Sequence, residues 1–136
     1  MNDFSILQID DNELDRERLR KSLKKLAFDG PLHEAIDGQE ALQILSGDTY
    51  IKVETPLLIF LDLNMPRLSG YEFLNAVRAN PIRAKNAHIV VLTTSEDPRD
   101  RKRTEGHRLS GYLIKPATPE KIKNLMDGIF QGGENK

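Results

Sequence analysis

The most constraining feature of this sequence is an unbroken apolar run, Leu57 to Leu61, that leads directly into Asp62. A run of that length is typical of a β-strand covered on both faces, as in a parallel sheet. Asp62 then follows the carboxyl end of a buried strand, the edge where open α/β sheets place their ligand sites. Pro66 and Gly70 indicate a turn into the next helix. A lone aspartate after a strand is more often an exposed loop residue, so the role of Asp62 depends on the other strand ends.

Four further apolar segments alternate with helical patterns along the chain. The predicted strands lie at 4–9, 32–36, 57–61, 89–92 and 111–114, and the predicted helices at 12–28, 39–46, from Ser69 or Gly70 onward, 97–109, and from Thr118 to Phe130. Alternation of this kind predicts a parallel sheet with right-handed crossover connections. Five strands and five helices predict the α/β class, as a flavodoxin-like doubly wound sheet with strand order 2-1-3-4-5.

The segment 97–109 is expected to form the least stable of these helices. Its one large apolar residue is Leu109, and Gly106 costs about 1 kcal/mol relative to alanine in a helix interior. Burial of a large aliphatic side chain contributes roughly 1.5–3 kcal/mol, so the contacts that are missing here outweigh surface ion pairs. A weak helix directly after Thr93 would suit a conformational switch, although a frayed helix with no regulatory meaning fits equally well.

Length and composition predict a single domain without a membrane or nucleic-acid role. The 136 residues suffice for one core, expected over 4–131 with a polar tail at 132–136 and no output domain. The net charge of -1 argues against a broad nucleic-acid surface, and the absence of cysteine excludes thiol chemistry. No apolar run approaches the roughly 20 residues of a membrane span, and the first residues do not resemble a signal peptide. We therefore expect a cytoplasmic location.

Polar side chains follow four of the five predicted strands. Asp10 and Asp11 follow the first strand, Asp62 the central one, Thr93 the fourth and Lys115 the last. Because the carboxyl ends of parallel strands meet at one edge of a sheet, we expect these side chains to lie close together. Each residue alone has a plainer explanation, such as a helix-start carboxylate, a strand-end hydroxyl or a solvated turn lysine. Their occurrence at four strand ends together favours one functional site.

The predicted site has the composition of a phosphoryl-transfer centre. Three carboxylates in one pocket repel each other and need a counter-charge, which a hard divalent cation such as Mg²⁺ provides through oxygen ligands. A lysine and a hydroxyl suit the oxygens of a transferring phosphoryl group. A carboxylate can itself accept that group as an acyl phosphate. The sequence therefore predicts an Mg²⁺-dependent site with Asp62 as the nucleophile, assisted by Thr93 and Lys115.

At this point the sequence resembles the response-regulator receiver domains of two-component signalling, over nearly the whole chain. The matching motifs are the acidic pair Asp10-Asp11, the run Asp62-Leu63-Asn64-Met65-Pro66, the hydroxyl of Thr93, the aromatic Tyr112 and the pair Lys115-Pro116. The resemblance implies that Asp11, Asp62 and the backbone carbonyl of Asn64 hold the metal, with Asp10 acting through water. It also implies that Asp62 is the phospho-acceptor.

The same resemblance implies a switch and a set of partners. Thr93 and Tyr112 would rearrange on phosphorylation, and Lys115 would contact the phosphoryl group. The pattern around Thr93 and the long loop at 47–56 are similar to stand-alone regulators paired with phytochrome-type kinases. A histidine kinase would then be the phosphodonor, and the signal would pass to an unknown downstream protein or phosphotransfer domain; a homodimer is compatible with the sequence. The chain would catalyse only its own phosphorylation and dephosphorylation, without being an enzyme in the usual sense.

The Lys115–Pro116 peptide bond is expected to be cis. Only about 5–6% of X-Pro bonds in folded proteins are cis, so the sequence alone would favour trans. The need to aim Lys115 into the pocket while Thr118 begins a new helix favours cis, and so does the family resemblance.

Two alternative functions remain open at the sequence level. A haloacid-dehalogenase-like phosphatase also uses an aspartate nucleophile after an apolar strand, but it requires a second aspartate two residues on, where this chain has Asn64. A pseudo-receiver, which binds partners without accepting phosphate, usually lacks an acidic residue or the lysine. This chain retains all of them, so the single-domain response regulator is the preferred hypothesis.

Overall fold

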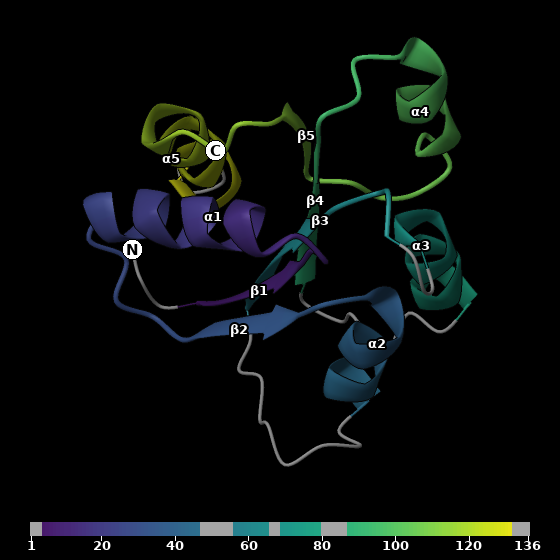
Figure 1. Cartoon of the computed structure of the whole chain (residues 1–136), viewed down its shortest axis with the longest axis horizontal. Helices are drawn as coiled ribbons and strands as arrows, with labels where there is room; N and C mark the ends of the chain where they lie inside the picture. Colours follow the sequence, from purple (N-terminus) through teal and green to yellow (C-terminus); the bar gives the residue numbers. More distant parts are fainter. Residues whose placement is uncertain (1–3, 47–55, 66–68, 80–86, 132–136) are drawn as a thin grey trace.

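The computed structural model describes residues 4–46, 56–65, 69–79 and 87–131. Strands and helices alternate along the chain, as the sequence predicts (Figure 1). The elements are β1 (Ser5–Ile9), α1 (Glu13–Lys25), β2 (Leu32–Ala35), α2 (Gly38–Ser46), β3 (Leu57–Leu61), α3 (Gly70–Ala79), β4 (Ala87–Thr93), α4 (Pro98–Arg103), β5 (Gly111–Ile114), α5 (Pro119–Met126) and a π-helical turn, η2 (Asp127–Gln131).

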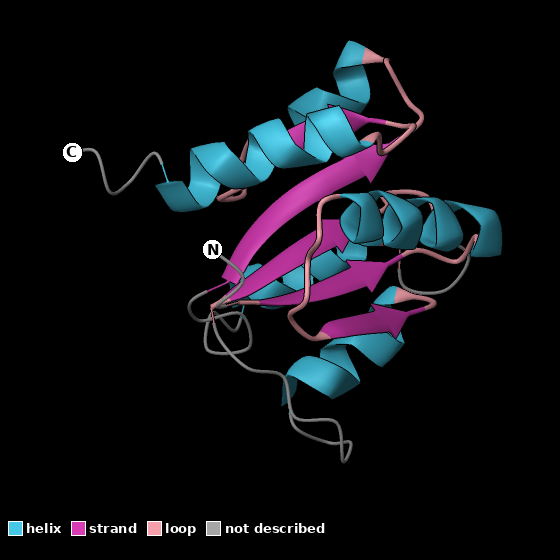
Figure 2. Cartoon of the chain, turned by 90° about the vertical axis from the view of Figure 1, so that its left-hand side faces the viewer, coloured by secondary structure: helices cyan, strands magenta, loops and turns pink. Residues whose placement is uncertain are grey.

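The five strands form one parallel sheet with the order β2-β1-β3-β4-β5. This is the predicted flavodoxin-like arrangement, and Figure 2 shows the strands running in the same direction. β1 and β3 are neighbours in the middle of the sheet, with Ile9 opposite Leu61. The residues that follow these two strands therefore emerge side by side at the carboxyl edge.

Helices cover both faces of the sheet. α1 and α5 lie on one face, and α2 and α3 lie on the other (Figure 1). Every residue of the central strand β3 is buried, because alternate side chains enter the two cores. The core beneath α1 and α5 includes Phe4, Ile6, Leu19, Leu23, Leu58, Phe60 and Ile122. The core beneath α2 and α3 includes Leu7, Ile9, Ile44, Ile59, Leu61, Phe73, Leu74 and Val91.

The first helix ends earlier than predicted. The helical pattern continues to Phe28, but α1 stops at Lys25 because Ala27 adopts a left-handed conformation with φ of 59°. The Ala27 N–H donates to the Lys24 carbonyl and the Phe28 N–H donates to the Leu23 carbonyl, both at 3.0 Å. These two bonds form a Schellman closure, which is usually made with glycine and was not apparent from the sequence here.

The charged segment 97–109 is helical only over Pro98–Arg103. The predicted extent was wrong: Thr104 caps the helix, and the segment beyond it contains Gly106 and offers little apolar surface until Leu109, which packs against the core. The closing helix also differs, since it changes to a π-helical turn at Asp127. Of the predicted loop at 47–56, residues 47–55 lie outside the described residues, and so do the turn at Pro66 and the tail at 132–136.

Two other sequence-based expectations concern the described chain. The Lys115–Pro116 peptide bond is cis, which confirms the prediction. Within the residues that the structure describes, none of the helices has the length and apolar character needed to cross a lipid bilayer.

Candidate phosphoryl-transfer site

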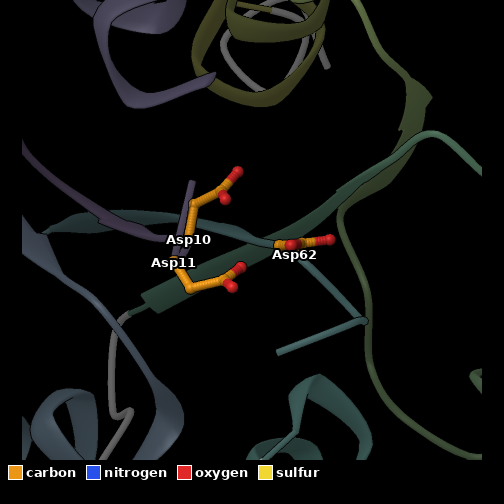
Figure 3. Close-up of side chains that lie close together, drawn as sticks. All are labelled: Asp10, Asp11 and Asp62. Atoms are coloured by element: carbon orange, nitrogen blue, oxygen red, sulfur yellow. The ribbon is translucent and has the colours of Figure 1, made fainter. Parts of the chain in front are cut away.

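Asp10 and Asp62 lie next to each other because their strands are adjacent. The Asp62 N–H donates to the Ile9 carbonyl at 2.9 Å, which extends the pairing of β1 and β3 by one residue. Both side chains are buried, whereas Asp11 is exposed. Figure 3 shows the three carboxylates at the ends of these two central strands. The predicted convergence of the acidic residues is thus present.

The three carboxylates are close enough to share one cation. Asp10, Asp11 and Asp62 each offer an oxygen, and these oxygens lie within 4.8 Å of one another. The Asn64 N–H donates to Asp62 Oδ1 at 3.3 Å, so the backbone of Asn64 borders the same cluster. Carboxylate and carbonyl oxygens are the donors that Mg²⁺ prefers, and three carboxylates carry more charge than the Lys115 ammonium group beside them can offset. The residues present therefore fit a hard divalent cation.

Lys115 reaches this cluster from the end of β5. Its Nζ donates to Asp10 Oδ2 and to Asp15 Oδ2, at 2.8 Å in each case, and lies 3.9 Å from Asp62 Oδ2. The Lys115 side chain is only 8% exposed. The Lys115 N–H also donates to the Thr93 carbonyl at 2.7 Å, which fixes the strand end that carries the side chain. A buried ammonium group thus faces the carboxylates, as predicted.

The electrostatics of the site make Asp62 an unusual carboxylate. Burial raises its pKa from the ordinary 3.8 to about 6; Lys115 acts in the opposite direction, and Asp10 adds to the increase. Burial alone would lower the pKa of Lys115, but its hydrogen bonds to Asp10 and Asp15 outweigh burial and the pKa is raised. At neutral pH the site therefore presents a charged lysine beside a mostly ionised Asp62.

Thr93 and Tyr112 lie on the α2–α3 side of the sheet. Thr93 is fully buried, and its Oγ1 accepts a hydrogen bond from the Ser95 N–H at 3.2 Å. Tyr112 packs against the same core as Val91, the residue opposite it on β4. The Tyr112 hydroxyl is buried without a hydrogen-bond partner in the part of the chain that the structure describes, and the Arg101 guanidinium lies 4.9 Å from its ring centre. Their predicted roles as switch residues remain predictions.

A polar network beside Thr93 was not apparent from the sequence. Ser95 Oγ donates to Asp100 Oδ2, and the Tyr71 hydroxyl donates to Asp100 Oδ1 at 3.0 Å. The Arg103 guanidinium lies 3.5 Å from the centre of the Tyr71 ring. This Ser95–Asp100–Tyr71 network joins the end of β4 to α4 and α3. Nothing in the spacing of these residues indicates it, because it depends on how the two helices are placed.

The contact of Asp15 with Lys115 and the close packing at Gly70 were also not apparent from the sequence. Asp15 lies three residues after Asn12, the N-cap of α1, and this N-cap spacing is the one sequence signal that places Asp15 near the strand end. At Gly70, a Cβ atom would lie 2.5 Å from the Asp62 carbonyl oxygen and 2.6 Å from Leu63 Cα. The start of α3 therefore approaches the Asp62 backbone as closely as only glycine allows.

Comparison with known proteins gives a consistent answer. The family model described as "Response regulator receiver domain" matches residues 6–127. The probable chemotaxis protein CheY of Rhizobium etli is 31% identical, over 93% of this chain and 92% of its own length. Response regulator Rcp1 of Synechocystis sp. is 31% identical, over 91% of this chain and 84% of its own length.

Solved structures agree with the sequence comparisons. The manganese-bound form of Rcp1 has a TM-score of 0.75 and 29% identity, and the match covers 94% of each chain. The phosphorylated cyanobacterial phytochrome response regulator RcpA has a TM-score of 0.76 and 28% identity, covering 93% of this chain and 90% of its own. Neither the phosphatase nor the pseudo-receiver alternative is favoured by these matches. The fold, the acidic cluster and the family match lead to one conclusion: the chain belongs to the response regulator receiver domain family of two-component signalling.

Proposed function

We propose that this chain is a response regulator whose Asp62 accepts a phosphoryl group from a histidine kinase. The observation that carries this proposal is the cluster of Asp10, Asp11 and Asp62, within reach of the buried Lys115 ammonium group, at the carboxyl edge of the sheet. We further propose that the receiver domain spans residues 4–131. The similarity to RcpA, a cyanobacterial phytochrome response regulator, supports a phytochrome-type kinase as the partner.

The transfer itself is a displacement at phosphorus. An oxygen of ionised Asp62 forms a bond to the phosphorus as the bond from phosphorus to the kinase histidine nitrogen breaks, and the imidazole leaves with the electron pair and takes up a proton. Asp11, Asp62 and the carbonyl of Asn64, with Asp10 acting through water, would hold Mg²⁺, which offsets the phosphoryl charge when it is bound. Lys115 offers its ammonium group to the same oxygens.

The phosphorylated state would act through surfaces next to the site. Thr93 would turn its hydroxyl towards the phosphoryl group, and Tyr112 would then change its packing. Tyr112 lies in β5, with the Arg101 guanidinium of α4 over its ring, and Thr93 ends the neighbouring strand β4. The surface formed by α4, β5 and α5 would therefore change. The consequence is contact with a downstream protein or onward transfer of the phosphoryl group to a phosphotransfer domain.

Intact-mass measurement after incubation with acetyl phosphate and Mg²⁺ tests the assignment. We expect one added phosphoryl group in the wild type, none in Asp62→Asn, and none when a chelator removes the divalent cation. Asp97→Asn is the matched control, because Asp97 caps α4 away from the cluster. Labelling of Asp62→Asn, or labelling that is unaffected by the chelator, would contradict the proposal. A subsequent screen of histidine kinases, phytochrome-type enzymes included, would identify the physiological donor.

A further inference from the structure

Lys115 is held by two carboxylates, those of Asp10 and Asp15. Asp15 is not one of the site residues predicted from the sequence. Asp10 and Asp15 each accept from Lys115 Nζ at 2.8 Å, whereas Asp62 Oδ2 is 3.9 Å away, beyond hydrogen-bond distance. The Asp15 side chain is 25% exposed, compared with 7% for Asp10. Asp15 is thus a second, more accessible anchor for the lysine.

The position of Asp15 is fixed by the start of α1. The Asn12 N–H donates to Asp10 Oδ1 at 2.9 Å, and the Asp15 N–H donates to Asn12 Oδ1 at 3.0 Å. With the two bonds from Lys115, these contacts close a ring that runs Asp10, Asn12, Asp15, Lys115 and back to Asp10. Each member restricts the next, so the ammonium group is held in one place before any phosphoryl group arrives.

The ring leaves part of the lysine free for chemistry. An ammonium group has three N–H donors, and Asp10 and Asp15 take two of them. The third is available for Asp62, whose nearer oxygen lies at ion-pair distance. A phosphoryl group attached to Asp62 would add oxygens in the region between that carboxylate and the lysine, where the third donor can be used.

We propose that Asp15 is a positioning residue for the phosphoryl-transfer reaction, acting through Lys115. This inference rests on the proposed function of Asp62. Asp15 orients the ammonium group in the free protein, so that less reorganisation is needed when the phosphoryl group is transferred. Its own negative charge lies near the path of an anionic phosphodonor and opposes donor binding. Loss of Asp15 should therefore change the maximal rate and the donor concentration at half-saturation in different ways.

The test compares Asp15→Ala and Asp15→Asn with the wild type in the full chain, using acetyl phosphate as the donor at saturating Mg²⁺. We expect the maximal phosphorylation rate to fall about tenfold in Asp15→Ala, and less in Asp15→Asn, which keeps an oxygen acceptor. The half-saturating donor concentration should stay the same or fall. Both variants should fold, because the bond to Asn12 uses the Asp15 backbone N–H rather than its side chain.

Glu17→Gln is the matched control. It removes one negative charge from the same helix, where Glu17 forms an exposed ion pair with Lys21 at 3.2 Å. An equal loss of rate in Glu17→Gln would overturn the proposal in favour of a general charge effect. Unchanged maximal rates in both Asp15 variants would also overturn it.

A second measurement separates this inference from the proposed function. Nitrogen NMR of the lysine ammonium groups reports whether Lys115 is held, without any phosphorylation. We expect a slowly exchanging Lys115 ammonium signal in the wild type, and faster exchange in Asp15→Ala but not in Glu17→Gln. Failure of the wild type to accept phosphate contradicts the proposed function, whereas a Lys115 signal that does not respond to Asp15→Ala contradicts the positioning role.

Discussion

Asp62 is held at its strand end by backbone contacts on both sides. On one side its N–H pairs with the Ile9 carbonyl, and on the other the Gly70 N–H donates to the Leu63 carbonyl at 3.1 Å. Gly70 is buried, and no room exists for a side chain between it and the Asp62 backbone. The position of the Asp62 carboxylate therefore depends on the packing of Gly70 against the Asp62 backbone, although Gly70 takes no part in the reaction itself.

Gly70→Ala should displace the loop that carries Asp62. The added Cβ would lie 2.5 Å from a backbone oxygen, so the backbone itself has to move. We expect the free energy of unfolding to fall by roughly 1–3 kcal/mol, as for other overpacked sites, and phosphorylation to slow. Urea denaturation measures the first effect. Gly128→Ala is the control, since a Cβ there meets nothing within 4 Å and alanine favours the helical turn, so its stability should not decrease. Equal stability of the two variants would contradict this account.

Among the helices, α4 is held to the rest of the molecule by polar contacts rather than by buried apolar side chains. It contains no buried residue, whereas α3 buries Phe73, Leu74 and Val77. Its contacts are polar: Asp97 caps its first turn, and Asp100 accepts from Ser95 and Tyr71. Burial together with the hydrogen bond to Asp100 raises the pKa of Tyr71 to about 12, so its hydroxyl stays protonated and donates at neutral pH.

Hydrogen exchange should show α4 to be the least protected helix, and Tyr71→Phe should expose it further. The α4 amides are expected to exchange faster than those of α5. Loss of a hydrogen bond to a carboxylate costs about 1.5 kcal/mol, so Tyr71→Phe should accelerate α4 exchange about tenfold. Tyr112→Phe is the control, because that hydroxyl has no partner among the described residues and its loss breaks no bond.

Protection of α4 equal to that of α5 would refute the stability claim. An exchange rate that changes on phosphorylation would support a switch, and an unchanged fast rate would support simple fraying.

For the molecule as a whole, the position of a side chain could be predicted from the sequence wherever it follows from the strand order. Asp10, Asp62 and Lys115 lie at one edge because parallel strands end together, and this follows from the apolar runs that precede them. Contacts between separate elements could not be predicted in the same way. The Lys115–Asp15 pair joins residues that are 100 positions apart, and the Tyr71–Asp100 bond depends on the relative placement of α3 and α4. Such contacts are set by helix packing, which leaves no periodic signal in the sequence.

The stability of the whole molecule should depend on pH through Asp62. Its pKa in the folded protein is raised to about 6 from 3.8, mainly by burial, so the folded state binds the proton more tightly than the unfolded state. The resulting stabilisation is fully present below about pH 4, decreases as the pH rises to about 6, and is absent at pH 7. Without divalent cations, Asp62→Asn should therefore be more stable than the wild type at pH 7, by roughly 1–3 kcal/mol, and similar to it at pH 4.

Thermal and urea unfolding at these two pH values, with chelator and then with Mg²⁺, measure this difference. Mg²⁺ stabilises whichever protein binds it in the folded state, so it should raise the Tm of the wild type more than that of Asp62→Asn. Asp97→Asn is the control of opposite sign: hydrogen bonds from the Arg99 side chain and backbone lower the pKa of Asp97, so loss of this charge should not stabilise the protein at pH 7. If Asp62→Asn is less stable than the wild type at pH 7 in chelator, burial of the charged Asp62 is not what opposes folding. Because the same ionised carboxylate is the proposed nucleophile, a stabilised Asp62→Asn that takes up no phosphate would show that this position gives up folding stability for its chemistry.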